Sequence, residues 1–274
     1  MSVLLTPFHY QANQACFKQL SQLPGVELYH AHVQAHSFDA HAHHTFGIGT
    51  VEHGVQRFRH GGRDHLAGKG SLVLMNPDVV HTGAAETAAG WCYCMLYIEP
   101  EALATLTGGQ GHWFRDVLRQ DPQRAWQLSQ LLAGLWHSQD GLSIDAMLLS
   151  VTELLQPHIS VGALPARVGA HRFNEVNAYL RSEFASVITL SDLAALVSLS
   201  PYHFQRLYKA QHHVSPQQML MAIRLNEAKR LLSQGVPAAQ VAAGVGLTDQ
   251  AHLTRAFARR YGLTPGRYQK QVMA

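Results

Sequence analysis

The 274-residue sequence has few cysteines, no long apolar segment and little charge. Its three cysteines, Cys16, Cys92 and Cys94, are too few for a disulfide framework and favour a reducing cytoplasm. No run of roughly 18 or more apolar residues occurs, and the N-terminus lacks the charged and apolar regions of a signal peptide. We therefore expect neither a membrane helix nor export.

The net charge of +3 conceals an uneven distribution. From residue 171 onward, 12 Lys and Arg residues stand against 5 Asp and Glu residues, whereas residues 1–170 carry 9 against 13. The two parts thus have net charges of +7 and −4. A basic C-terminal part joined to a mildly acidic part is typical of a protein that has a nucleic-acid-binding domain and a separate second domain.

The last hundred residues contain one helix-turn-helix pattern twice. Residues of the first copy recur about 48 positions later in the second, and the register then slips by one, so that Arg206 and Tyr208 correspond to Arg255 and Phe257. The positions with matching apolar character are Leu193, Ala194, Val197 and Leu199 in the first copy and Val241, Ala242, Val245 and Leu247 in the second. Two copies in tandem predict an all-α domain of two similar units.

Helix boundaries in this part follow from capping residues. A helix is expected from His171 to about Phe184, and Thr189 or Ser191 is suited to cap the next one. Pro201 and Pro216 fit the first turns of two later helices. The helix that begins at Pro216 has of order 18 residues and spans ~27 Å at ~1.5 Å per residue. Such a connector suits two reading helices about one DNA turn apart, roughly 34 Å.

The first half of the chain reads as strands followed by helices. From Val26 to about Ile98, short apolar or alternating runs are separated by turn residues, which predicts a small antiparallel barrel or sandwich. The turn residues are Gly54, Gly61-Gly62, Gly68, Gly70, Asn76-Pro77 and Gly83. Helices are expected over residues 100–107, 113–137 with an interruption near Asp121-Pro122, and 143–156. We place the first domain at 1–160, a Pro- and Gly-containing linker at 161–170 and the second domain at 171–274.

Two apolar stripes run along the expected helices between about 122 and 156. One includes Trp126, Leu128 and Leu132, and the other includes Ile144 and Leu148. These stripes either pack onto the barrel or form the seam of a homodimer. We expect a homodimer, because exposed stripes of this size would otherwise leave a large apolar patch.

Residues 171–270 resemble the DNA-binding domain of AraC-type bacterial transcription regulators. The segment 246–268 carries the family's hallmark, which reads GLTDQAHLTRAFARRYGLTPGRY in this chain. Two departures stand out: Leu247 occupies a position where an aromatic residue is commoner, and His212-His213 replaces a glycine-containing turn. The resemblance implies a sequence-specific regulator of transcription, with double-stranded DNA and a small-molecule effector as partners and RNA polymerase as a further candidate partner.

The two reading helices present polar residues opposite their apolar faces. Arginine can bind guanine O6 and N7 bidentately, and glutamine can do the same to adenine N6 and N7. The resemblance implies base contacts at the same positions. These are Tyr202, Gln205 and Arg206 in the first helix and Gln250, His252 and Arg255 in the second. Lys209, Thr254 and Arg259 are expected on phosphate. For the arginines, the structural alternative is an ion pair within the domain.

The first domain resembles the cupin-like sensor found in front of many such regulators, since His41-Ala42-His43 and His81 match the histidines of the two cupin motifs. Strand alternation would place His41 and His43 on one face. The glutamate that follows the paired histidines in metal-binding cupins is replaced by Gly47, and Glu52 stands five residues further along. The three histidines are therefore candidates for an effector pocket, for a divalent metal such as zinc, or for a purely structural role.

Other candidates in this domain carry weaker signals. Cys92 and Cys94 share a strand face and are expected to be small buried hydrophobes, although either is a candidate to line the pocket. Nothing in the spacing of His30, His32 and His36 singles them out.

We therefore predict a cytoplasmic α+β protein of two domains that binds DNA under effector control and requires no cofactor. It acts as an activator or as a repressor, and the sequence leaves both open. The alternative is a cupin metalloenzyme, a dioxygenase or isomerase, with a DNA-binding domain attached. The missing glutamate argues against it, as does the lack of a nucleophile elbow, a phosphate loop or a telling pair of carboxylates.

Overall fold

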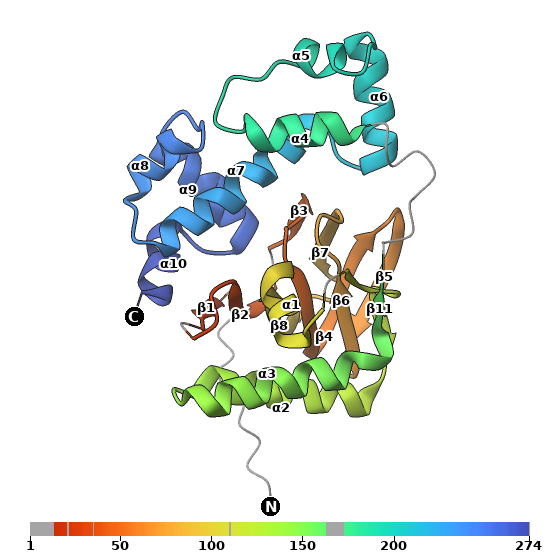
Figure 1. Cartoon of the computed structure of the whole chain (residues 1–274), viewed down its shortest axis with the longest axis vertical. Helices are drawn as coiled ribbons and strands as arrows, with labels where there is room; N and C mark the ends of the chain where they lie inside the picture. The colour runs from red at the N-terminus through yellow and green to blue at the C-terminus, as the bar shows by residue number, and fades with distance from the viewer. Residues whose placement is uncertain (1–13, 21, 35, 110, 163–172, 274) are drawn as a thin grey trace, which may run out of the picture. The chain divides into compact units, whose positions relative to one another are not determined.

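The computed structural model describes residues 14–20, 22–34, 36–109, 111–162 and 173–273. The chain divides into two compact units (Figure 1). The first, called the sheet unit, comprises residues 1–37, 44–78 and 83–164, and the second, called the helical unit, comprises residues 38–43, 79–82 and 165–274. No helix within the described residues combines the length and apolar composition needed to cross a bilayer.

The sheet has nine strands within the described residues. Six of them follow one another as neighbours, in the order β1 (Gln14–Gln19), β2 (Val26–Val33), β8 (Trp91–Ile98), β4 (Phe46–His60), β6 (Ser71–Met75) and β10 (Leu118–Gln120). In addition, β5 (Arg63–Gly68) pairs with β4, and β7 (His81–Ala85) pairs with both β4 and β3 (Phe38–His41). The expected antiparallel architecture is confirmed. The described strands form an open, barrel-like sheet that does not close on itself.

One face of this sheet packs against helices. Leu28, Ile48 and Leu96 come from neighbouring strands and share a core with helices α1 (Pro100–Thr107), α2 (Pro122–His137) and α3 (Gly141–Leu155). Figure 1 shows α2 and α3 side by side along the sheet, and α2 contacts β4, β6 and β8. Each fully buried leucine in such a core contributes roughly 1.5–3 kcal/mol to folding.

This packing corrects the basis of the dimer expectation. Most of the two apolar stripes lie inside the core of a single chain, where Leu128, Leu132, Ile144 and Leu148 are buried. The large apolar side chains that stay exposed on these helices are fewer: Trp126 at 57%, Leu142 at 80% and Leu149 at 45%.

The segment before α2 also differs from expectation. A helix was expected from residue 113, but this segment instead contains the strands β9 (His112–Phe114) and β10. Asn76 holds β9 in place: its Nδ2 donates to the carbonyl of Phe114 at 2.9 Å, and its Oδ1 accepts from the amide of Phe114 at 2.7 Å. After α3, a short 3-10 turn η1 (Gln156–His158) leads into β11 (Ile159–Val161), which pairs with β9.

The helical unit contains two helix-turn-helix pairs joined by a long helix. The pairs are α5 (Leu190–Ala195) with α6 (Pro201–His212), and α8 (Ala238–Gly244) with α9 (Gln250–Tyr261). α7 (Pro216–Ser233) connects them with 18 residues, α4 (Asn174–Ser182) precedes them and α10 (Pro265–Val272) follows. Most of the expected linker and the expected helix start at His171 lie outside the described residues.

The capping residues act as the sequence predicts. Thr189 caps α5 and forms a capping box with Asp192, which satisfies two backbone donors at the helix start. Pro201 and Pro216 occupy the first turns of α6 and α7. His213, at the end of α6, has a left-handed φ of 62°, so it performs the turn for which glycine is the usual residue.

Candidate nucleic-acid interface and effector site

The first reading helix, α6, has one buried face and one exposed face. Phe204 and Tyr208 are fully buried and pack with Phe173 in the core of the first helix-turn-helix unit. Tyr202 is 75% exposed. The other predicted DNA-contact residues of this helix, Gln205, Arg206 and Lys209, are exposed as well. All four side chains are therefore available for contact with a ligand as large as DNA.

The second reading helix, α9, repeats this arrangement. Asp249 caps it by accepting from the amide of His252 at 2.6 Å, and Leu253 and Phe257 are fully buried. Gln250, Arg255 and Arg259 are exposed, and His252 and Thr254 are partly exposed. The Thr254 hydroxyl donates to the carbonyl of Gln250 at 2.8 Å, so it faces the helix backbone before any phosphate is bound.

The arginines of the helical unit fall into two groups. Within the described residues, no ion pair involves Arg206 or Arg255, so the structural alternative for them finds no support. On α7, by contrast, Arg230 pairs with Glu227, and Arg224 donates to the carbonyls of Phe184 and Ser186 at 2.7 and 2.9 Å. Arg206 and Arg255, at the predicted base-reading positions, thus keep their guanidinium donors for a ligand, whereas Arg224 and Arg230 stabilise the helical unit through contacts within it.

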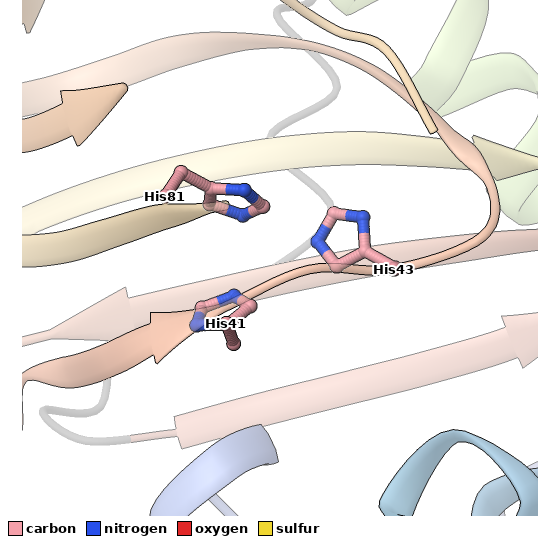
Figure 2. A group of neighbouring side chains, drawn as sticks. All are labelled: His41, His43 and His81. Atoms are coloured by element: carbon pink, nitrogen blue, oxygen red, sulfur yellow. The ribbon is translucent and has the colours of Figure 1, made fainter. Parts of the chain in front are cut away.

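The three predicted effector histidines come together (Figure 2). His41 ends β3, His43 follows just after the strand, and His81 begins β7. The ring centroid of His81 lies 4.3 Å from that of His41 and 4.7 Å from that of His43, and one nitrogen of each ring lies within 4.8 Å of the others. The strand expected to carry both His41 and His43 ends at His41, two residues before His43, yet the rings still converge.

Hydrogen bonds define the state of two of these rings. His41 Nδ1 bonds to the carbonyl of Asp39, and His81 Nδ1 bonds to the carbonyl of Val79 at 3.0 Å. A carbonyl only accepts, so each Nδ1 carries the proton and each neutral ring keeps a lone pair on Nε2. Burial, followed by the Arg260 guanidinium and the two neighbouring imidazoles, lowers the pKa of His41 well below its usual value of 6.5.

The group contains no carboxylate among the described residues. Gly47 stands where the cupin glutamate is expected, and a Cβ added there would lie 3.3 Å from Met95 Cε and 3.4 Å from Met75 Cβ. Glu52 belongs to a different group, in which its carboxylate contacts His30 and Cys92. The three imidazoles thus offer a cluster of nitrogen ligands or, on rings that are neutral, hydrogen-bond acceptors.

This second group carries no signal that can be read along the sequence. His30, Glu52 and Cys92 come from three strands and are separated by 22 and 40 positions along the chain. No disulfide links Cys16, Cys92 or Cys94 within the described residues, and Cys92 and Cys94 are buried, as expected.

Comparison with known families assigns both parts of the chain. An AraC-like ligand binding domain matches residues 23–155, and a helix-turn-helix domain matches residues 193–271. The chain belongs to the AraC-type transcription regulators. As an AraC-type regulator it has the two-domain organisation described above, with a ligand-binding module followed by a DNA-binding module.

Several curated regulators are similar over most of this chain. The MmsAB operon regulatory protein of Pseudomonas aeruginosa is 26% identical over 245 residues, covering 86% of this chain and 78% of its own. The uncharacterized HTH-type transcriptional regulator YbfI of Bacillus subtilis is 28% identical over 239 residues, covering 82% and 86%. These relatives are regulators of transcription, which favours regulation over the enzyme alternative.

Among solved structures, ToxT of Vibrio cholerae has a similar fold. The apo form of a single-residue variant of ToxT covers 90% of this chain and 98% of its own, with a TM-score of 0.54 at 13% identity. The unsaturated fatty acid bound form of wild-type ToxT matches with a TM-score of 0.52 at 12% identity. At this identity the similarity concerns the fold, and it confirms an antiparallel sheet domain followed by helix-turn-helix units.

Proposed function

We propose that this AraC-type regulator recognises its DNA site through the exposed faces of α6 and α9. The observation that carries this proposal is the repeated division of each helix into a buried apolar face and an exposed polar face. Base contacts are assigned to Tyr202, Gln205, Arg206, Gln250, His252 and Arg255. Phosphate contacts are assigned to Lys209, Thr254 and Arg259.

The electrostatics of the C-terminal part support this assignment. Its net charge of +7 favours phosphate binding, because each phosphate that is neutralised releases condensed counterions and adds about −0.9 to the slope of log K against log salt. We expect residues 171–274 to bind duplex DNA on their own with a steep salt dependence. A fragment with a native circular dichroism spectrum and no DNA affinity at low salt would contradict the proposal.

We infer that His41, His43 and His81 form part of the effector site. Their three rings converge, and the Nδ1 bonds of His41 and His81 orient two of them. Because the pKa of His41 is lowered, this ring is neutral at pH 7. We therefore expect the effector to place a hydrogen-bond donor against His41. An anionic group would need a charged imidazole there.

A thermal-shift titration with candidate metabolites tests the effector site. A ligand that binds only the folded chain raises its stability by RT ln(1 + [L]/Kd), and His81→Asn should reduce the shift. The matched control is His65→Asn on β5, outside the group. Elemental analysis of protein purified without a histidine tag shows whether the group instead holds a metal, in which case acid should release the ion. If a ligand stabilises His41→Asn and His81→Asn as much as the wild type, the effector site lies elsewhere.

We further propose that the protein is a homodimer and acts in the cytoplasm. In this proposal it activates transcription together with RNA polymerase, and DNA binding needs no cofactor. The exposed Trp126 and Leu149 on α2 and α3 support the dimer. Cysteines without a disulfide among the described residues suit a reducing compartment. A relative named HTH-type transcriptional activator RhaS, from Citrobacter koseri, is 25% identical over 84% of this chain and supports activation. Transcription from a reporter in cells with and without the gene distinguishes activation from repression.

A further inference from the structure

Three metal-ligating side chains meet in the sheet unit, outside the three-histidine group. His30 lies on β2, Cys92 on β8 and Glu52 on β4, and their ligand atoms all lie within 4.8 Å of one another. His30 Nε2 is 2.8 Å from Glu52 Oε2, and Cys92 Sγ is 3.6 Å from each of these two atoms. The three atoms therefore form a closed triangle.

The sheet register explains how residues so far apart in the sequence meet. β8 lies between β2 and β4, so Cys92 has a neighbouring strand on each side. His30 is paired with Cys94 and thus lies diagonally from Cys92 across the β2–β8 ladder. On β4, a bulge between Val51 and His53 inserts Glu52 as an extra residue. A bulge re-aims side chains next to it, and here the Glu52 carboxylate reaches the other two groups.

The three side chains of this group are polar or ionisable, yet they are largely shielded from solvent. His30 and Cys92 are 4% and 1% exposed, and the Glu52 side chain is 17% exposed. The Cys92 thiol donates to Glu52 Oε2 at 3.6 Å, so it carries a proton in this arrangement. A divalent ion would be balanced by one thiolate, one carboxylate and one neutral imidazole, which leaves no net charge in a buried place.

The distances suit a tetrahedral ion. Zinc bonds of about 2.3 Å to sulfur and about 2.0–2.1 Å to nitrogen or oxygen imply ligand separations of about 3.5 Å from sulfur to either other ligand in a tetrahedron. The two observed sulfur separations are 3.6 Å. Only the His30–Glu52 separation must open, from a hydrogen bond of 2.8 Å to about 3.4 Å.

We propose that His30, Glu52 and Cys92 bind a divalent ion of the zinc class and thereby join β2, β8 and β4. The ion replaces the proton of the Cys92 thiol, which passes to solvent. It also replaces the hydrogen bond between His30 Nε2 and Glu52: the Nε2 proton leaves through solvent, and the neutral ring that binds the ion carries its proton on Nδ1. Three protein ligands leave a fourth position for water or another small ligand. This site is independent of both the DNA contacts and the effector histidines.

Cobalt titration of the full chain tests the proposal. The protein is purified without a histidine tag, freed of metal with a chelator and titrated with Co²⁺ while the near-ultraviolet thiolate-to-cobalt charge-transfer band is recorded. We expect one thiolate-linked cobalt per chain, displaced by Zn²⁺. The three-histidine group contains no thiol, so a metal bound there gives no such band, and His41→Asn should leave the band unchanged.

Variants assign the ligands. Cys92→Ser should abolish the band, and Glu52→Gln and His30→Gln should each weaken cobalt binding at least about 10-fold, since even outer-shell changes cost this much. Cys16→Ser and His53→Asn are the matched controls and should bind cobalt like the wild type. No band at saturating cobalt, or a band that survives Cys92→Ser, overturns the site. If Cys92→Ser does not fold, unchanged affinity in both Glu52→Gln and His30→Gln overturns it equally.

Discussion

Ser198 and Gly246 occupy the same turn position in the two helix-turn-helix units, and both have a left-handed backbone, with φ values of 53° and 71°. The second unit uses glycine, for which this conformation carries no steric penalty, whereas the first uses serine. At Gly246 an added Cβ would clash with the carbonyl oxygen of Ala185. The same turn conformation therefore costs more free energy at Ser198 in the first unit than at Gly246 in the second.

Substitutions at these two positions should change stability in opposite directions. Ser198→Gly should raise the free energy of unfolding by up to about 1 kcal/mol, because it removes a left-handed non-glycine residue. Gly246→Ala should lower it by more than about 1 kcal/mol, since it adds both the left-handed strain and the contact with Ala185. Urea denaturation measures both, with Gly266→Ala on α10 as the control, where a Cβ meets open space. A neutral Gly246→Ala would contradict the turn assignment.

Arg259 should act on DNA through charge alone. Its Nε lies 3.8 Å from Asp39 Oδ2 in an exposed pair, which is weak enough for a phosphate to replace. Arg259→Ala is expected to lower affinity equally for all sequences and to reduce the magnitude of the salt slope by about 0.9, which is the contribution of one phosphate. Fluorescence anisotropy at several salt concentrations measures the slope. Arg230→Ala is the matched control, because Arg230 is paired with Glu227 on the connecting helix. A slope that Arg259→Ala leaves unchanged would remove Arg259 from the phosphate contacts.

His212 should make the helical unit sensitive to acid. Its ring lies 4.4 Å from that of Tyr208, and burial, followed by the neighbouring His213, lowers its pKa from 6.5 to about 4. Between these two values the unfolded chain binds a proton that the folded chain does not, so the free energy of unfolding falls as the pH decreases through this window. Above about pH 6.5 neither state is protonated there, and the effect vanishes.

The contribution of His212 is measured by comparing urea denaturation at pH 7 and pH 5. His212→Gln should show a smaller loss of stability on acidification than the wild type, whatever its stability at pH 7. His203→Gln is the control, because His203 is exposed on the same helix. Equal losses in His212→Gln and the wild type would show that another group carries the acid sensitivity.

The dimer proposal depends on the apolar side chains that the core of the sheet unit leaves exposed. Sedimentation at micromolar concentration should give twice the chain mass for the wild type, and Trp126→Glu combined with Leu149→Glu should give a monomer. Leu66→Glu on β5 is the control, since Leu66 is 54% exposed but lies outside these helices. A monomeric wild type would show that α2 and α3 serve only to cover the sheet.

Local signals predicted the helical part well. Thr189, Pro201 and Pro216 determine helix starts through interactions within a few residues, so their effects can be read directly from the sequence. The exposed positions of Arg206 and Arg255 followed from the period of the helix alone. Their roles in reading DNA remain predictions.

Long-range pairing explains what the sequence did not reveal. Residues 112–114 and 118–120 became strands because β11 and β6 provide partners far along the chain. The helix stripes were ambiguous because periodicity identifies an apolar face but not what covers it. His30, Glu52 and Cys92 escaped notice because only the register of three strands and one bulge brings them together.

Binding-site selection from random duplexes, performed with the full chain and two variants, tests most directly whether α6 and α9 read the DNA. We expect the wild type to select two conserved elements about one helical turn apart. Arg206→Ala should relax base preference at one position in one element, and Arg255→Ala should do so in the other, each with a loss of about 1–3 kcal/mol. Base preferences identical to the wild type in both variants would contradict the assignment of α6 and α9 as the reading helices.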